Sequence, residues 1–287
     1  MVRSSFFRPA PAREVAFVCV SLLFTVNGFV ACSDTATATS DAGVDASAVD
    51  AGLVIGEGET LQTGRAALVQ TNKPVPEATI SAGSAQTTAD GEGLYSFIVP
   101  RNSPITLKVK APDHYQLIEQ EYIVDTQTYD RGDSLILKNQ TASLLAAFFG
   151  DYDKTKALVA VTVIPAKGCR SEQGTTLKLE PAGAVLRYTQ GGVPDNNTSL
   201  TAGETNGALF YNVTPGPVTV TAESPYCKPM PFPVKADGVT YTGKLTTEPG
   251  SSFSFIRIFL GPPAPATDAG EDATVDASSD ASDAATD

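Results

Sequence analysis

The chain has 287 residues and a formal net charge of −12, with one histidine, four cysteines and no tryptophan. This length is enough for two small domains, and the acidity is concentrated at the two ends. Between residues 53 and 261 there are 20 acidic and 17 basic residues, so the body is nearly neutral. A body without a basic excess is poorly suited to neutralising phosphates, and we expect no nucleic-acid partner.

Residues 1–31 have the layout of an export signal. Arg3, Arg8 and Arg13 precede an uncharged apolar run at residues 15–26, which is the order of basic and apolar regions in a signal peptide. The run is shorter than the roughly 20 apolar residues that a transmembrane helix needs. We therefore expect this segment to direct export and then to be removed.

The signal ends in Phe29-Val30-Ala31-Cys32, followed by Ser33. This order resembles the lipobox of bacterial lipoproteins, in which a small residue precedes the cysteine that receives the lipid, although Phe29 stands where leucine is usual. The resemblance implies lipidation of Cys32. Because Ser33 rather than aspartate follows, it also implies an outer-membrane lipoprotein of the cell envelope. An ordinary secreted or periplasmic protein and an uncleaved anchor remain the alternatives.

Two acidic segments flank the body. Residues 32–52 carry four acids and residues 262–287 carry seven, and neither segment carries a base. Both consist largely of Ala, Ser, Thr, Gly and Asp, which offer too little apolar surface to offset the entropy of ordering. We predict that both are disordered and that the first is a tether holding the body away from the membrane.

Residues 53–261 predict an all-β body. The segment is rich in Val, Ile, Thr, Tyr and Phe, in short runs broken by Gly, Pro, Asn and Asp. Several runs place apolar residues at every second position, as a strand with one buried face requires. The clearest examples are Tyr95, Phe97, Val99, Ile105, Leu107 and Val109.

The body also contains an internal repeat. The order of turn and apolar residues in 90–115 returns in 206–226, at an offset near 115 residues. That offset corresponds to one small β-domain. We therefore predict two tandem antiparallel β-sandwich domains, at residues 53–139 and 140–261.

The first domain carries a more specific pattern. Lys73-Pro74-Val75-Pro76-Glu77-Ala78-Thr79-Ile80 is followed by Asp90-Gly91-Glu92-Gly93-Leu94-Tyr95. Residues 62–138 resemble the carboxypeptidase regulatory-like domain, an accessory family with a transthyretin-like (prealbumin-like) β-sandwich. The resemblance implies this fold for the first domain, and through the repeat for the second, and it implies no peptidase activity. Asp113-His114 stands where the family often has glycine.

Two cysteines remain after Cys19 leaves with the signal and Cys32 is lipidated. Cys169 and Cys227 are an even pair in an exported chain, which favours a disulfide. Closing a loop of roughly 58 residues would stabilise the fold by about 4 kcal/mol in the chain-entropy model. A zinc site is the alternative, but two cysteines without a nearby histidine fall short of four ligands. We expect no metal and no cofactor.

Side chains that could carry catalysis are sparse. His114 lies in a Pro-Asp-His-Tyr segment, and no serine stands in a G-x-S-x-G setting. Asp151 and Asp153 form a carboxylate pair on a predicted loop. Arg131-Gly132-Asp133 spells an integrin-type tripeptide, which we interpret as a turn before the next strand.

These observations favour a non-enzymatic, lipid-anchored protein of the cell envelope that serves as a binding, structural or adhesion module. Its partners would be the membrane, through the lipid, and an envelope protein or glycan. A glycan-binding accessory module and a hydrolase with an unrecognised site are the alternatives. Rings for a glycan could come from five tyrosines, several of which we expect at the sandwich ends with hydroxyls in water. They are Tyr115, Tyr122, Tyr129, Tyr188 and Tyr226.

Overall fold

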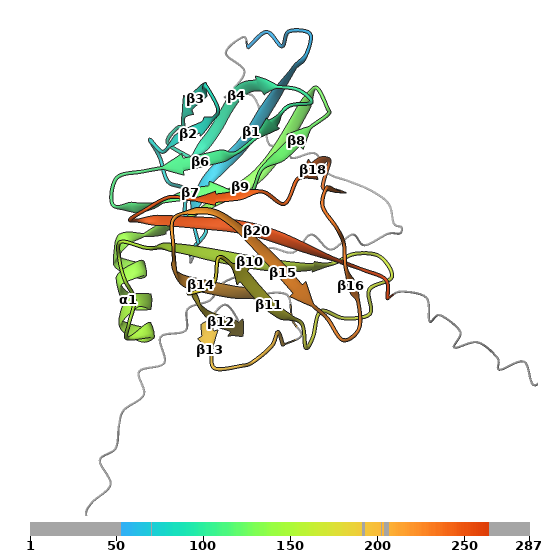
Figure 1. Ribbon diagram of the computed structural model, residues 1–287. Coiled ribbons are helices and arrows are strands. Elements are labelled where there is room, and N and C mark those ends of the chain that lie inside the picture. Colours follow the sequence, from blue (N-terminus) through green and yellow to red (C-terminus); the bar gives the residue numbers. More distant parts are fainter. Residues whose placement is uncertain (1–52, 70, 191–192, 202, 204–206, 264–287) are drawn as a thin grey trace, which may run out of the picture.

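A computed structural model describes residues 53–69, 71–190, 193–201, 203 and 207–263. The predicted export signal, the tether and all but the first two residues of the acidic tail lie outside these residues. Nearly all of the regular secondary structure in the described residues is strand, as predicted (Figure 1). We call β1–β9 the N-terminal module and β10–β20 the C-terminal module.

The N-terminal module consists of short and medium strands. They are β1 (Glu59–Leu68), β2 (Thr79–Ala82), β3 (Ala85–Thr88), β4 (Leu94–Pro100), β5 (Pro104–Ile105), β6 (Leu107–Lys110), β7 (His114–Glu119), β8 (Tyr122–Val124) and β9 (Thr128–Lys138).

One helix and the second set of strands follow. They are α1 (Asn139–Phe149), β10 (Ala157–Pro165), β11 (Thr176–Glu180), β12 (Val185–Gln190), β13 (Val193–Asp195), β14 (Gly207–Val213), β15 (Gly216–Glu223), β16 (Lys228–Pro229), β17 (Val234–Ala236), β18 (Val239–Tyr241), β19 (Leu245–Thr247) and β20 (Ser252–Gly261).

The two modules share a topology, which explains the repeat in the sequence. In the N-terminal module β1 lies between β4, which is antiparallel to it, and β9, which is parallel. In the C-terminal module β10 lies in the same way between β14 and β20. On the other layer β6 lies between β2 and β7, and β15 between β11 and β19. Each module is therefore a sandwich built by the same order of strands.

The strands form where the apolar alternation predicted them. On β4, Tyr95, Phe97 and Val99 are buried while the residues between them are more exposed. On β2 and just before it, Ile80 and Ala78 are both fully buried. Strand β20, which is central in its sheet, is buried along most of its length, because a strand with neighbours and layers on both sides needs no polar face.

Three strand pairings in the described chain are parallel: β1 with β9, β10 with β20, and β7 with β20. We predicted antiparallel sandwiches, and most of the pairings are antiparallel. Parallel neighbours need a long connection between them. The first and last strands of each module meet that condition, because the rest of the module separates them in the sequence.

Helix α1 was not predicted, because its helical pattern spans only three turns. It places Ala142, Leu145 and Phe149 on one buried side, at positions i, i+3 and i+7. The Phe149 ring stacks on Tyr211 of β14, with centroids 4.3 Å apart. The helix starts at Asn139, where we placed the end of the first domain, and its buried residues join the hydrophobic core that the two modules share.

Two loops of the N-terminal module contain residues with positive φ. Asp90 forms a turn in the first, accepting hydrogen bonds from the backbone N–H groups of Glu92 and Leu94 at 2.9 and 2.8 Å. The residue with positive φ in this turn is Gly93 (76°). In the second loop Asp113 has φ of 59°, a conformation that Asp tolerates better than most residues.

Candidate functional site

The most distinctive feature of the molecule is the junction between its two modules. Strand β7 of the N-terminal module pairs in parallel with β20 of the C-terminal module, so that Leu117 lies beside Phe253 and Ile118 beside Ser254. A second seam joins β8 to β18, with Tyr122 opposite Tyr241. In Figure 1, β20 runs along the boundary between the modules. Sheet hydrogen bonds therefore pass without interruption from one module to the other.

The loop between β7 and β8 belongs to both modules. The Gln120 backbone N–H donates to the carbonyl of Phe255 at 3.0 Å, and the Gln120 side-chain oxygen accepts from the Arg257 N–H. The Glu121 N–H donates to the Lys244 carbonyl at 2.8 Å, and the Thr242 N–H donates back to Glu121 at 3.1 Å. The backbone of this loop is consequently fixed by residues of the C-terminal module.

A buried ion pair lies at the end of β7. The guanidinium of Arg131 on β9 donates two hydrogen bonds to the carboxylate of Glu119, at 2.6 and 2.7 Å. Their side chains are 8% and 4% exposed. Burial alone would lower the pKa of Arg131, but the attraction and hydrogen bonds of Glu119 prevail and raise it above its ordinary value. Arg131 therefore keeps its charge, and removing either partner of this buried pair carries a large penalty.

Buried tyrosines continue this polar cluster. The Gln62 amide of β1 donates to the Tyr122 hydroxyl at 2.8 Å, and the hydroxyls of Tyr95 and Ser134 are 2.9 Å apart. Burial raises the pKa of both tyrosines. Each phenol is therefore kept in its neutral form, which can hydrogen-bond inside the protein.

A row of aromatic rings crosses the junction. The Tyr122 ring lies 6.1 Å from Tyr129 of β9 and 6.5 Å from Tyr241 of β18. Tyr241 in turn lies 5.4 Å from Phe259 of β20, and the Arg257 guanidinium lies 5.4 Å from the Tyr241 centroid. Tilted rings at these spacings attract one another in addition to the area that they bury. The row therefore packs the modules together like the interior of one domain.

Three of the six ion pairs in the described residues also cross this junction. Lys108 pairs with Glu248 at 2.5 Å and Lys244 with Glu121 at 3.3 Å, and Lys235 pairs with Asp125. Each of these solvent-exposed ion pairs contributes little to the free energy of folding. Together the three pairs place opposite charges across the junction, which favours one orientation of the modules.

The tripeptide Arg131-Gly132-Asp133 lies inside strand β9, so our interpretation of it as a turn was wrong. Gly132 has φ of 68° at a β-bulge, where β9 has one more residue than β1. Arg131 is buried against Glu119, and Asp133 accepts two hydrogen bonds from Arg65 at 2.7 and 2.8 Å. Both charged groups of the tripeptide are therefore engaged within the protein.

The other candidate catalytic residues, His114, Asp151 and Asp153, form hydrogen bonds that hold loops in place. His114 hydrogen-bonds the Pro112 carbonyl through Nδ1, beside a shallow hollow near the start of α1. Asp153 accepts from the backbone and hydroxyl of Thr155, which lower its pKa. Asn212 of β14 donates to the Asp151 carbonyl and accepts from the Asp153 N–H. These aspartates therefore organise the entry to β10.

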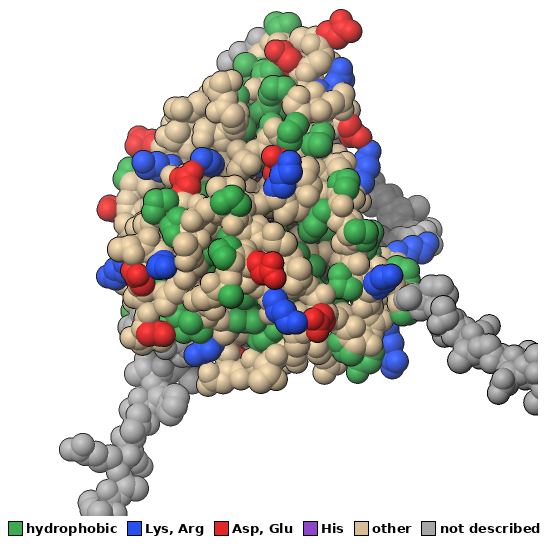
Figure 2. Space-filling model, viewed as in Figure 1, with side chains coloured by type: hydrophobic (Ala, Val, Ile, Leu, Met, Phe, Trp, Pro, Cys, Tyr) green, Lys and Arg blue, Asp and Glu red, His purple; other side chains and the backbone are tan. Residues whose placement is uncertain are grey.

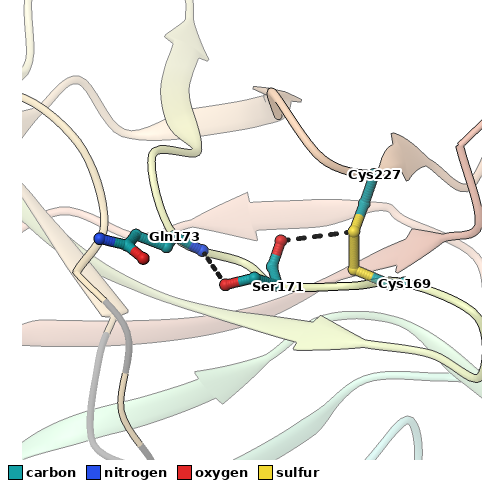
Figure 3. Close-up of a disulfide and its surroundings, with 4 residues drawn as sticks. All are labelled: Cys169, Ser171, Gln173 and Cys227. Atoms are coloured by element: carbon teal, nitrogen blue, oxygen red, sulfur yellow. Dashed lines mark hydrogen bonds between the residues drawn. A yellow bond between two sulfur atoms is a disulfide. The ribbon is translucent and has the colours of Figure 1, made fainter.

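The disulfide is formed as predicted. Cys169, after β10, is bonded to Cys227, before β16, with Cα atoms 5.2 Å apart. The Ser171 carbonyl lies 3.3 Å from the Cys227 sulfur, and the Ser171 hydroxyl accepts from the Gln173 N–H at 3.1 Å (Figure 3). The cross-link and these contacts fix the loop that leads into β11.

The tyrosines do not form an exposed platform. Tyr115, Tyr122 and Tyr188 are buried with hydrogen-bonded hydroxyls, contrary to our expectation of hydroxyls in water. Tyr226 is 41% exposed. Figure 2 shows acidic and basic side chains interspersed over the visible face, without a large patch of one sign.

Two further observations bear on function. Over the described ranges, no cluster of three or more His, Cys, Asp or Glu side chains could hold a metal ion. None of the helices in this part of the chain is long and apolar enough to cross a membrane. The predicted lipidation site, Cys32, lies outside the described residues.

Comparisons with known proteins give no family. No protein-family model matches the chain, and no curated protein matches it. Among solved structures it is similar to the minor pilin GBS52 of Streptococcus agalactiae, at 10% identity and a TM-score of 0.24 over 72% of this chain and 98% of that one. It is also similar to the major pilin of Streptococcus pyogenes, at 12% identity and a TM-score of 0.22 over 71% and 98%. Likeness at this level establishes neither a shared fold nor a shared function.

Proposed function

We propose that this chain is a non-enzymatic, lipid-anchored protein of the cell envelope whose two β-modules form one rigid structural or adhesive body. The observation that carries the proposal is the junction. It combines continuous sheet hydrogen bonds, the buried pair Glu119–Arg131 and the aromatic row through Tyr122 and Tyr241.

Such a junction resists bending. A hinge between the modules would break the β7–β20 ladder and bring water to the Glu119–Arg131 pair. Modules joined by small polar interfaces move relative to one another. Here the sheet and a shared hydrophobic core cross the boundary. A rigid body suits a spacer or a display platform, and it does not need a catalytic cleft.

The ends of the described chain suggest an orientation at the membrane. The chain enters β1 at the far tip of the N-terminal module, where the Arg101 N–H donates to the Gly58 carbonyl. It leaves β20 beside β16, in the C-terminal module (Figure 1). With a tether ending at residue 52, the N-terminal module would face the membrane and the C-terminal module would point outward.

Rigidity can be tested by distance measurement in the Cys32→Ala chain after export. Spin labels at Lys73→Cys and Lys178→Cys, an exposed position on β11, place one probe on each module. A rigid body predicts a single narrow distance distribution between the probes. A broad or two-peaked distribution would overturn the proposed rigidity.

The anchor is tested separately by fractionation. Wild type should sediment with membranes, and Cys32→Ala should move to the soluble fraction. The matched control Ser33→Ala leaves the lipid-accepting cysteine in place and should stay with the membranes. If wild type and Cys32→Ala fractionate alike, the lipid-anchor part of the proposal fails.

The alternative functions have their own tests. A glycan-binding module should lose retention on envelope polysaccharide when Tyr226→Ala removes the exposed ring. A hydrolase that uses the chain's one histidine should lose activity in His114→Ala. We expect Tyr226→Ala to leave polysaccharide retention unchanged and His114→Ala to leave hydrolase activity unchanged, because the proposed function depends on the junction and on neither residue.

A further inference from the structure

A shallow hollow of about 420 Å³ lies beside the disulfide, where the described chain ends. Its wall includes Pro225, Tyr226, Lys228, Pro229 and Pro263. Prolines and an exposed tyrosine ring form the kind of surface that holds extended, proline-containing segments. The hollow is therefore suited to a peptide rather than to a compact ligand.

The rim of the hollow is basic. The Arg170 guanidinium lies 5.5 Å from the Tyr226 ring centroid. Lys228 lines the hollow and pairs in the sheet with Gly261. Neither of these two cations forms an ion pair within the described residues.

One acid also lines the hollow, and it already has a partner. Glu223 accepts a hydrogen bond from Lys178 at 2.7 Å, which lowers the pKa of the carboxyl. Arg170 and Lys228 at the rim are therefore uncompensated, and an anionic segment would complement them.

The sequence supplies such a segment directly after Pro263. Residues 264–272 read Ala-Pro-Ala-Thr-Asp-Ala-Gly-Glu-Asp, with one proline and three acids. Five residues of extended chain reach about 17 Å, so Asp268 can reach the rim. Attachment at the hollow also gives this segment a high effective concentration there.

We propose that the hollow beside the Cys169–Cys227 disulfide is a docking surface for the chain's own acidic segment, residues 264–272. The segment is too poor in apolar residues to fold alone, as its composition predicts, but docking adds the proline contacts and charge pairs that it lacks. The docked segment covers Tyr226 and Arg170. Because these attractions act between exposed charges, salt weakens them.

The chain lacks tryptophan, so Tyr226→Trp provides a unique fluorescent probe at the hollow. We compare acrylamide quenching of this probe in the full exported chain, with and without Asp268→Asn, Glu271→Gln and Asp272→Asn. At low salt, neutralising these acids should raise the quenching constant about twofold. In 1 M salt the quenching constants of the two chains should become equal.

Three controls make the test decisive. Neutralising Asp276, Asp280 and Asp283 instead should leave quenching unchanged. Lys228→Gln should raise quenching as the acid variants do, whereas Lys73→Gln in the N-terminal module should not. Equal quenching of the two chains at low salt would overturn intramolecular docking. Protection from quenching that grows with protein concentration would also overturn it, and would mean that the hollow binds another copy of the chain. Membrane fractionation and the interprobe distance test the proposed function independently of this result.

Discussion

The two modules share a strand order but hold their centres together in different ways. Strand β1 of the N-terminal module turns Thr60 and Gln62 inward, whereas its counterpart β10 turns Val159 and Val161 inward, and all four are buried. Inward polar groups need partners, and Gln62 finds one in Tyr122. At these positions the same topology is thus filled with polar side chains in one module and with apolar side chains in the other.

The means of stabilisation follow this difference. The C-terminal module has the disulfide, while the described N-terminal module contains no cysteine. Instead its buried network holds β8, and β8 pairs with β18 of the other module. The N-terminal module is therefore tied to its neighbour through the junction, whereas the C-terminal module also has a covalent cross-link of its own.

The largest expected effect comes from breaking the buried pair. Glu119→Gln leaves the charge of Arg131 buried without a counter-charge, which should reduce the unfolding free energy by about 3–5 kcal/mol. Replacing both, as Glu119→Gln with Arg131→Met, should recover much of the loss. Urea unfolding followed by circular dichroism measures both variants.

The exposed pair on the C-terminal module gives the matched control for that experiment. Glu223→Gln removes the partner of Lys178, whose side chain is 69% exposed, and should leave the unfolding midpoint unchanged. If Glu119→Gln and Glu223→Gln behave alike, the junction does not depend on its buried charges.

Removing the disulfide should have the next largest effect. Cys169→Ala with Cys227→Ala frees a loop spanning 58 residues, and the chain-entropy model gives a loss of about 4 kcal/mol as an upper value. Because the modules share a core, we expect one thermal transition that moves to lower temperature as a whole. Two transitions, only one of which moves, would show that the modules unfold independently.

Alkaline pH should destabilise the protein in part through the buried tyrosines of the N-terminal module. Burial raises the pKa of Tyr95 and Tyr122 above 10. Above about pH 10 the unfolded chain therefore loses protons that the folded chain keeps. Stability is complete below that pH and falls as pH rises, by up to about 1.4 kcal/mol per pH unit for each such tyrosine.

Unfolding free energies measured between pH 8 and 11.5 check this slope. Tyr122→Phe should make the slope shallower, although it lowers stability at pH 8 because Gln62 loses its partner. Tyr226→Phe, on the exposed hollow, is the matched control. A slope that Tyr122→Phe does not change would contradict the assignment of the alkaline loss to the junction.

Apolar alternation and turn residues predicted much of this fold. They placed the strands around Tyr95 and Leu107, and the cysteine pair was predicted from its even number in an exported chain. The repeat at an offset near 115 residues corresponds to strands with the same neighbours in both modules. The strands and turns are determined by neighbouring residues, and the disulfide follows from two remaining cysteines, so a single sequence is enough to predict them.

The junction could not be predicted in the same way. Glu119 follows the apolar end of β7 and Arg131 lies in a charged stretch of β9, and nothing in sequence spacing says that two residues twelve apart meet inside the protein. Gln62 gave no signal either, because residues 60–63 show no apolar alternation that would point its side chain inward. Only the structure shows that Gln62 is buried and therefore needs a partner, which is Tyr122.

The smallest effect tests the left-handed residue between β6 and β7. Asp113 has φ of 59°, and its carbonyl accepts from the Asn139 N–H at 2.9 Å, which joins this loop to α1. Asp113→Gly should change the unfolding free energy by less than about 0.5 kcal/mol, because Asp is among the residues that tolerate the left-handed region. Asp113→Val should cost about 1–2 kcal/mol, since a branched side chain is strained there. Equal unfolding free energies for the Gly and Val variants in urea would mean that the loop does not hold a left-handed residue at this position.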